Sequence, residues 1–311
     1  MKDIVNINKL NADFGIENEL VFVEGKGGLP FIQVNNKKAS ALISIYAGQV
    51  LSYKPVNEAE DFMFTSDNAF FQNGKSIKGG IPICWPWFGA APAPETTVKV
   101  KLPNHGFVRD HFWSVVSAEK IKNGDTKIKL EFVDTDETRG MWPYQFHLSL
   151  EIYIGESLTL ELLTKNTGNE AFIMTEALHT YFNVGDAAQV EVLGLEKTEY
   201  LDKSQDFIKV CQIGAIKLSK ETDRIHVDVE HDLTIKDPVF NRKIKIVSLG
   251  NKNVVVWNPW EKGSKEIVDL EKEDYKHFVC VEIANAAADI VELSPGEEYQ
   301  LITDYSLCEE G

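Results

Sequence analysis

The strongest constraint on the fold is a hydrophobic pattern with a period of two residues. Residues 146–154 alternate apolar and polar side chains over nine positions, and residues 158–162 do so again after a Gly155-Glu156 turn. Segments 225–229 and 244–247 follow the same rule. Because successive side chains of a strand point to opposite faces, each segment predicts a strand with one buried face. Repeated along the chain with short turns, the pattern predicts antiparallel sheets packed face to face.

Turn and helix signals favour the same class. A turn containing Asn, Gly and Asp separates residues 113–121 from 127–133 and predicts a hairpin. Helical patterns are scarce, and only 57–62 and 269–275 are candidates for a turn or two of helix. No linker or break in composition divides the chain. We therefore expect an all-β protein, a single large antiparallel β-sandwich domain over residues 1–311 with few short helices.

Charge and cysteine usage restrict the partners. The formal net charge is −16 and the pI is about 4.9, which argues against a nucleic-acid or anionic-membrane partner. No stretch of about 18 apolar residues is present to cross a membrane. Cys84, Cys211, Cys280 and Cys308 are widely spaced and form neither a disulfide framework nor a zinc motif. We expect reduced thiols, a cytoplasmic protein and, given the acidic surface, a monomer.

Two unusually dense segments suggest one pocket. Residues 78–89 contain three glycines, two prolines, two tryptophans and a phenylalanine directly after Lys78, and residues 104–110 follow soon afterwards. Glycine allows close backbone approach, proline fixes the path of the chain, and aromatic faces suit the apolar faces of a sugar ring. A rigid turn packed under a sheet is the alternative for the first segment alone. The candidate aromatic walls of the pocket are Trp85, Phe88 and, from a later aromatic turn, Trp257.

Two further residues stand out in apolar strands. His179 shares a strand face with Ala177 and Tyr181, where a histidine is more often a hydrogen-bonded core residue than a catalyst. Glu282 is a single carboxylate in the apolar run 278–286, and burying it unpaired is expensive. Glu282 therefore needs hydrogen-bond donors, a cation or a functional reason, and it is a candidate site residue.

Several well-known motifs are absent from the sequence. Gly-Lys-Gly-Gly at 25–28 lacks the strand and helix of a nucleotide-binding loop, and no G-x-S-x-G nucleophile turn occurs. His105, His179 and Glu282 could be drawn as metal ligands, but no short metal-binding spacing supports them. We therefore expect no metal site.

Taken together, the dense segments resemble the aldose 1-epimerase superfamily, and within it the glucose-6-phosphate 1-epimerase branch. The matching segments occur in the family's order and are 78–89, 105–109, 177–182, 200–202, 257–260 and 281–282. The resemblance implies a galactose-mutarotase-like β-sandwich with an open cleft. It also implies interconversion of the α and β anomers of a hexose 6-phosphate, glucose 6-phosphate first among them, without cofactor or metal.

The resemblance also implies roles for single residues. His179 is similar to the family's general acid and Glu282 to its general base, while Lys78 and Arg109 resemble phosphate contacts. The further substrate contacts implied are Asn104, Asp202 and His105. The family often has arginine where this chain has Lys78, and lysine lacks the bidentate fork that suits phosphate.

Three other functions compete with this one. A noncatalytic carbohydrate-binding sandwich would keep the aromatic platforms without needing an acid and a base. A mutarotase of a non-phosphorylated aldose would keep the acid and base without a phosphate site. A glycoside hydrolase needs two carboxylates, but strand alternation turns Glu176, the available partner of Glu282, away from the face of His179.

Overall fold

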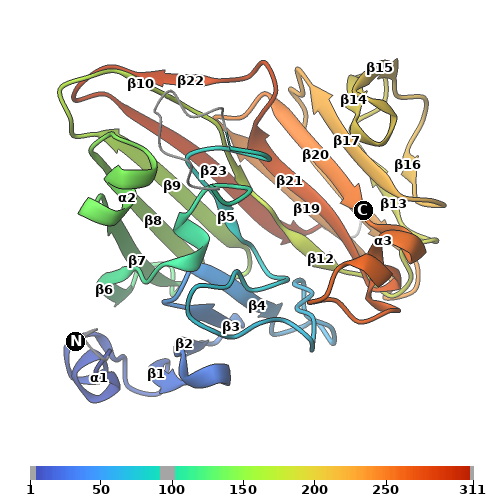
Figure 1. Cartoon of the computed structure of the whole chain (residues 1–311). Coiled ribbons are helices and arrows are strands. Elements are labelled where there is room, and N and C mark those ends of the chain that lie inside the picture. The colour runs from blue at the N-terminus through green and yellow to red at the C-terminus, as the bar shows by residue number, and fades with distance from the viewer. Residues whose placement is uncertain (1–4, 92–101, 309–311) are drawn as a thin grey trace.

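The computed structural model describes residues 5–91 and 102–308, and most of their regular structure is antiparallel strand (Figure 1). The predicted domain over 1–311 also includes residues 1–4, 92–101 and 309–311, which lie outside the described residues. The largest sheet has nine described strands in the order β16-β13-β18-β19-β23-β9-β8-β7-β6. These strands are β6 (Ser114–Lys120), β7 (Thr126–Val133), β8 (Phe146–Ile154), β9 (Leu158–Asn166), β13 (Glu191–Leu193), β16 (Ile216–Lys217), β18 (Leu233–Asp237), β19 (Arg242–Leu249) and β23 (Glu298–Leu307).

A second large sheet packs against the first. Its described order is β15-β14-β17-β20-β21-β11-β5, and β12 also pairs with β21. Its strands are β5 (Ile83–Cys84), β11 (Glu176–Leu178), β12 (Tyr181–Asn183), β14 (Glu199–Asp202), β15 (Ile208–Cys211), β17 (Thr222–Val227), β20 (Asn253–Asn258) and β21 (Phe278–Asn285).

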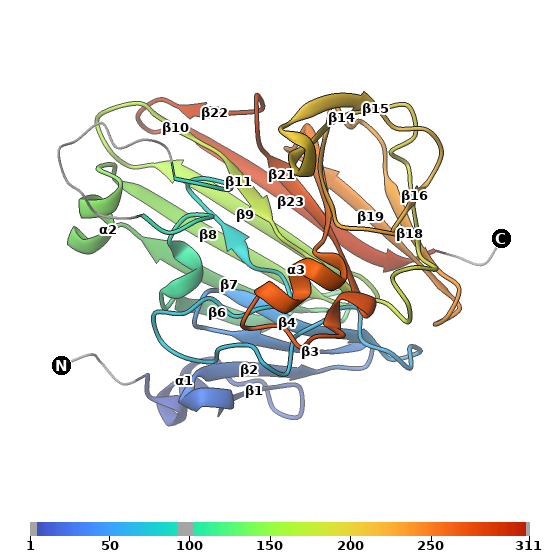
Figure 2. The ribbon, with the colours of Figure 1, turned by 45° about the vertical axis from the view of Figure 1, so that its right-hand side comes forward.

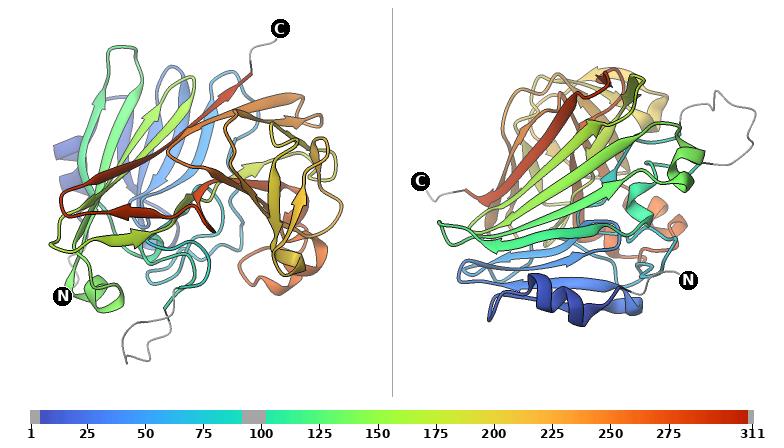
Figure 3. Two further views of the ribbon diagram at one scale, coloured as in Figure 1. Left: turned by 90° about the horizontal axis from the view of Figure 1, so that it is seen from above. Right: turned by 90° about the vertical axis from the view of Figure 1, so that its left-hand side faces the viewer.

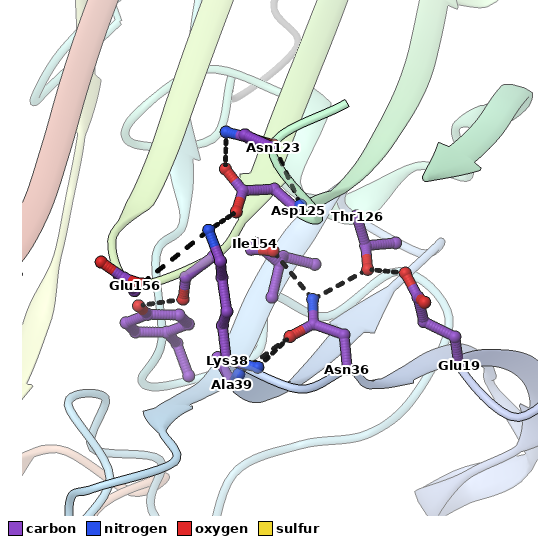
Figure 4. Close-up of polar contacts among 11 residues, drawn as sticks. Glu19, Asn36, Lys38, Ala39, Asn123, Asp125, Thr126, Ile154 and Glu156 are labelled. Carbon is purple, nitrogen blue, oxygen red and sulfur yellow. Dashed lines mark hydrogen bonds and ion pairs between the residues drawn. The ribbon is translucent and has the colours of Figure 1, made fainter. Parts of the chain in front are cut away.

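Two smaller sheets complete the described strands. One contains β1 (Leu20–Glu24), β2 (Pro30–Asn35), β3 (Ala39–Ser44) and β4 (Gln49–Pro55), and the other pairs β10 (Phe172–Met174) with β22 (Val291–Leu293). The β1–β4 sheet forms a layer beside β6–β9 (Figure 3). Polar contacts join the two layers (Figure 4): the Asn36 amide donates to Thr126 Oγ1 and to the Ile154 carbonyl, each at 2.9 Å, and Lys38 Nζ lies 2.9 Å from Asp125 Oδ1.

The strand pattern read from the sequence is confirmed. The predicted hairpin is β6–β7, and the alternating segments 146–154 and 158–162 lie in β8 and β9, which pair in register. The apolar positions of these strands face the sheet interface, where they meet those of the second sheet and form the main core. That face of the second sheet includes Val254, Val256, Val279, Val281 and Ile283.

The helical predictions were less accurate. Residues 57–62 form no helix, whereas 269–275 contain the start of a 3₁₀ turn. The described helices are α1 (Ile7–Phe14), α2 (Asp136–Met141) and α3 (Trp260–Glu266), and the 3₁₀ turns are η1 (Lys26–Gly28), η2 (Val108–Asp110), η3 (Lys203–Gln205) and η4 (Asp274–Lys276). Figure 2 shows α3 in front of the strands. None of the described helices has the length and apolar composition needed to cross a bilayer.

Candidate active site

Strand β21 carries the carboxyl group of the site. All eight of its residues are buried, so both faces of the strand are covered. Val279, Val281 and Ile283 enter the main core, and alternation turns Cys280 and Glu282 to the opposite face. The sequence pattern of a continuous apolar run with one acid therefore places a carboxyl group, 1% exposed, on the outer face of the second sheet.

His179 lies directly opposite this carboxyl group. Leu178 of β11 pairs with Ile283, and Tyr181 of β12 pairs with Cys280, so one register runs through the short break between β11 and β12. That register sets His179 across from Glu282, and His179 Nε2 lies 3.4 Å from Glu282 Oε1. The His179 backbone N–H donates to the Pro82 carbonyl, which fixes the chain at the break.

Aromatic rings hold the imidazole in place. The His179 and Tyr181 rings stack with centroids 4.9 Å apart and an interplanar angle of 9°. Trp257 and His105 meet the same imidazole edge-on at 5.9 and 5.7 Å. The predicted shared face of His179 and Tyr181 is thus confirmed, and the histidine is restrained by packing on several sides.

Burial disfavours charge on both members of this pair. Desolvation, followed by the charge of Asp223, raises the pKa of the Glu282 carboxyl well above its usual range. Desolvation, followed by the neighbouring His105, Arg109 and Lys78 side chains, lowers the pKa of the His179 imidazole well below its usual range. Both shifts make the ion pair less favourable than it would be in water. His179 Nδ1 and Glu282 Oε2 have no hydrogen-bond partner among the described residues.

A polar pocket adjoins the pair. Its volume is about 270 Å³, and Lys78, Arg109, Tyr181 and Asp269 are among the residues that line it. Because Tyr181 both lines this pocket and stacks on His179, the pocket and the pair are adjacent. Lys78 Nζ lies 3.6 Å from Asp269 Oδ1, and Arg109 Nη2 donates to the Asn104 carbonyl at 2.9 Å. Burial is the main cause that lowers the pKa of Lys78.

Two glycines allow the backbone to place Lys78 and Arg109 at this pocket. Gly80 has a φ of +61°, and a Cβ there would lie 2.1 Å from the Val50 carbonyl oxygen. Gly106 has a φ of +71°, and a Cβ there would lie 1.7 Å from the Trp85 carbonyl oxygen. Each position therefore requires glycine, for its backbone conformation and for the close approach. The first fixes the chain next to Lys78, and the second fixes the turn before Arg109.

Comparison with known proteins places the chain in a family. The family profile described as aldose 1-epimerase matches residues 30–306. A relative from Salmonella typhimurium, provisionally named glucose-6-phosphate 1-epimerase, is 36% identical over 261 residues, which cover 84% of this chain and 84% of the relative. The chain belongs to the aldose 1-epimerase family. It is an isomerase that interconverts the anomers of a sugar.

Solved structures agree with this assignment. A Salmonella typhimurium crystal structure, provisionally described as a mutarotase, superposes on the epimerase with a TM-score of 0.86 at 31% identity, covering 98% of this chain and 99% of the other. A galactose mutarotase-like protein from Clostridium acetobutylicum gives a TM-score of 0.73 at 15% identity, covering 94% of this chain and 100% of the other. The second likeness shows the fold alone, and it confirms the galactose-mutarotase-like sandwich.

Five of the residues named from the sequence gather at the site with His179 and Glu282. Lys78 and Arg109 line the adjoining pocket, and Trp257 contacts His179. His105 lies between Phe88, at 4.9 Å, and His179, and its Nδ1 accepts from the Gly89 N–H. Burial, followed by nearby cations, lowers the pKa of His105 to about 3, so its imidazole is neutral.

Three predicted site residues of the epimerase lie elsewhere or have other roles. Trp85 is fully buried in the main core, where its indole N–H contacts Thr164, so it forms no pocket wall. Asp202 is buried and caps η3, accepting hydrogen bonds from Ser204 and Gln205. Asn104 is exposed and lines a separate surface hollow, although its carbonyl holds Arg109. For Trp85 and Asp202, a core or local polar contact uses the side chain that a sugar was expected to meet.

The sequence analysis did not name several residues that lie at or beside the candidate site. Lys203, next to the predicted Asp202, lies over the Phe88 ring and pairs with Asp223 at 2.8 Å. Asp269 pairs with Lys78. Cys280 lies two positions before Glu282 on the same strand face, and this spacing was the one available signal for it. The ligand atoms of His179, Cys280 and Glu282 lie within 4.8 Å of one another.

Proposed function

We propose that the protein interconverts the α and β anomers of hexose 6-phosphates, glucose 6-phosphate first among them. The observation that carries the proposal is the pairing of His179, between β11 and β12, with Glu282 on β21, beside a pocket that contains Lys78 and Arg109. The pair supplies proton transfer, and the two cations supply an anchor for a phosphate group. A relative's name, glucose-6-phosphate 1-epimerase, agrees with this substrate.

The reaction needs one base and one acid at neighbouring oxygens. Glu282 removes the proton from the C1 hydroxyl while His179 donates a proton to the ring oxygen, and the bond from C1 to the ring oxygen breaks. Rotation about the C1–C2 bond of the open-chain aldehyde presents its other face, and the reverse proton transfers close the ring. Both oxygens are bonded to C1, so two groups 3.4 Å apart are close enough to serve them together.

Burial adjusts the pair for this chemistry. One proton resides on the imidazole when the ring is closed and on the carboxyl when it is open. In water the imidazole would hold this proton more firmly, because its usual pKa is the higher of the two. Burial lowers the pKa of His179 and raises that of Glu282, which shifts the balance towards the protonated carboxyl. General acid–base groups of this kind typically contribute about 10²- to 10⁴-fold each.

Asp269 competes with a phosphate group for Lys78, and this competition favours a second candidate function, mutarotation of a non-phosphorylated aldose. Asp269 already pairs with Lys78 at 3.6 Å, so a phosphate must displace a carboxylate from that lysine. A mutarotase of a non-phosphorylated aldose would have no such competition. Arg109, whose guanidinium contacts the neutral Asn104 carbonyl, is the stronger reason to keep phosphate as the first choice.

One assay tests both candidates. Anomer exchange is measured by NMR magnetisation transfer for glucose 6-phosphate and for glucose at equal concentration. We expect faster exchange for both sugars and a much larger kcat/KM for the phosphorylated one. Equal kcat/KM values would favour the non-phosphorylated aldose, and binding without faster exchange would favour a noncatalytic carbohydrate-binding protein.

A further inference from the structure

The thiol of Cys280 has no part in the proposed proton transfers, yet it lies in the same site. Cys280 and Glu282 occupy alternate positions of β21 on one face, and Tyr181 and Trp257 flank Cys280 on the neighbouring strands. Its sulfur, a His179 ring nitrogen and a Glu282 oxygen lie within 4.8 Å of one another, and all three residues are buried. The site therefore combines three kinds of donor atom in a small volume.

This donor set matches the ligands that zinc prefers. Imidazole nitrogen, thiolate sulfur and carboxylate oxygen bind Zn²⁺ at about 2.0–2.3 Å, and a tetrahedron of such bonds has edges of roughly 3.3–3.5 Å. The distance of 3.4 Å between His179 Nε2 and Glu282 Oε1 already equals such an edge. The other polar atoms of these side chains, His179 Nδ1 and Glu282 Oε2, have no hydrogen-bond partner among the described residues, so no further polar contact holds either side chain through them.

We propose that His179, Cys280 and Glu282 form a binding site for Zn²⁺ or a similar thiophilic dication, and that the bound ion inhibits the enzyme. On binding, the Cys280 thiol and the Glu282 carboxyl each release the proton that they hold to solvent and ligate as thiolate and carboxylate. Three protein ligands leave a fourth position for water. The ion then occupies both groups that transfer protons, so it excludes the sugar rather than assisting it.

The charges around this site are of both signs, so its selectivity among cations depends on the ligand atoms. Lys78 and Arg109, whose charges act on His179, oppose a dication, whereas Asp223, whose charge acts on Glu282, favours one. Because this field is mixed, affinity must come from the bonds to sulfur and nitrogen. Mg²⁺, which prefers oxygen ligands, therefore does not bind, whereas Zn²⁺, Cd²⁺ and Co²⁺ do.

Cobalt binding tests the site without any reference to activity. Untagged, chelator-treated protein with Cys211→Ser and Cys308→Ser, which removes the two cysteines that are not buried, is titrated with Co²⁺. We expect a thiolate-to-cobalt absorption band with a stoichiometry of one Co²⁺ per protein. The band should be lost when Cys280→Ser is added. It should be retained when Cys84→Ser is added, because Cys84 is the matched buried cysteine. Absence of the band, or its survival after Cys280→Ser, would overturn the proposal, and near-ultraviolet circular dichroism shows whether each variant is folded.

Inhibition is measured separately because it rests on the proposed function. Zn²⁺ should inhibit anomer exchange competitively with glucose 6-phosphate, and a chelator should reverse it. Cys280→Ser should raise the inhibition constant at least tenfold, measured against the variant's own metal-free rate. Unchanged inhibition in that variant would overturn the inhibitory part of the proposal. A protein without epimerase activity that still gives the cobalt band would overturn the proposed function and leave the metal site standing.

Discussion

The His179–Glu282 pair and the pocket of Lys78 and Arg109 are adjacent, but burial disfavours charge on the pair, whereas the pocket contains two cations. The pair is almost fully buried, and desolvation is the first cause of both pKa shifts. In the pocket Lys78 is balanced by Asp269, and Arg109 is half-buried. The comparison assigns a different function to each region. The dry region, the His179–Glu282 pair, transfers a proton with little net charge, and the wetter pocket of Lys78 and Arg109 binds an anion. The predictions below separate these two functions.

The largest expected effect is on the dry region. Glu282→Gln and His179→Asn should each lower kcat for anomer exchange by about 10²- to 10⁴-fold with little change in KM, because each removes a proton-transfer group. Glu176→Gln is the matched control. Glu176 is a fully buried carboxyl that contacts Thr164 in the interior, and this substitution should leave kcat unchanged. A normal rate in Glu282→Gln would rule out the assigned base.

Arg109→Ala tests the pocket. Loss of a charged hydrogen-bond donor typically costs about 1.5–3 kcal/mol, so kcat/KM for glucose 6-phosphate should fall by about 10- to 150-fold. Exchange of unphosphorylated glucose should be unaffected. An equal fall for the two sugars would mean that Arg109 acts on the chemistry or on the fold rather than on the phosphate.

Asp269→Asn should have a smaller effect in the other direction. Removing the carboxylate frees Lys78, and a partly exposed ion pair of this kind is worth at most about 1 kcal/mol. We expect KM for glucose 6-phosphate to fall by about two- to fivefold with kcat unchanged. Asp67→Asn, at an exposed aspartate that pairs with Lys26, serves as the control. A higher KM in Asp269→Asn would show that Asp269 helps to bind the sugar.

The mildest prediction concerns stability rather than rate. Burial raises the pKa of Glu176 from the ordinary 4.5 to about 8 in the folded protein. The folded state therefore holds this proton more tightly, and the stability gained from it is lost as pH rises from 4.5 through 8. Glu176→Gln removes this dependence, so its Tm should exceed that of the natural protein increasingly towards pH 8. A constant Tm difference measured by calorimetry would contradict the shift.

Single strands were predictable where one face of the strand is buried. The alternation in residues 146–154 and 158–162 defined β8 and β9, because only one side of each strand meets the core. The same rule fails at His226, which occupies a polar position of the alternating segment 225–229. It is fully buried, and its Nδ1 contacts Thr198 Oγ1 at 2.8 Å. The Tyr200 ring on the paired strand β14 also packs against it, and nothing local in the sequence indicates that contact.

The site residues show the same limit. Trp85 and Trp257 have similar aromatic surroundings in the sequence, but one fills the core and the other contacts His179. The family resemblance named Asp202 and not Lys203, but Asp202 caps a 3₁₀ turn and Lys203 lies over the Phe88 ring. Local composition identified the segments, and tertiary packing selected the side chains.

The sequence by itself determined the strand class, the glycines beside Lys78 and before Arg109, and the presence of one acid and one histidine in apolar strands. These properties depend on side-chain periodicity and backbone sterics, which act over a few residues. The tertiary structure decided that His179 faces Glu282, that Asp269 competes for Lys78 and that Cys280 joins the pair. These depend on strand register and desolvation, which are set only when segments distant in the chain pack together.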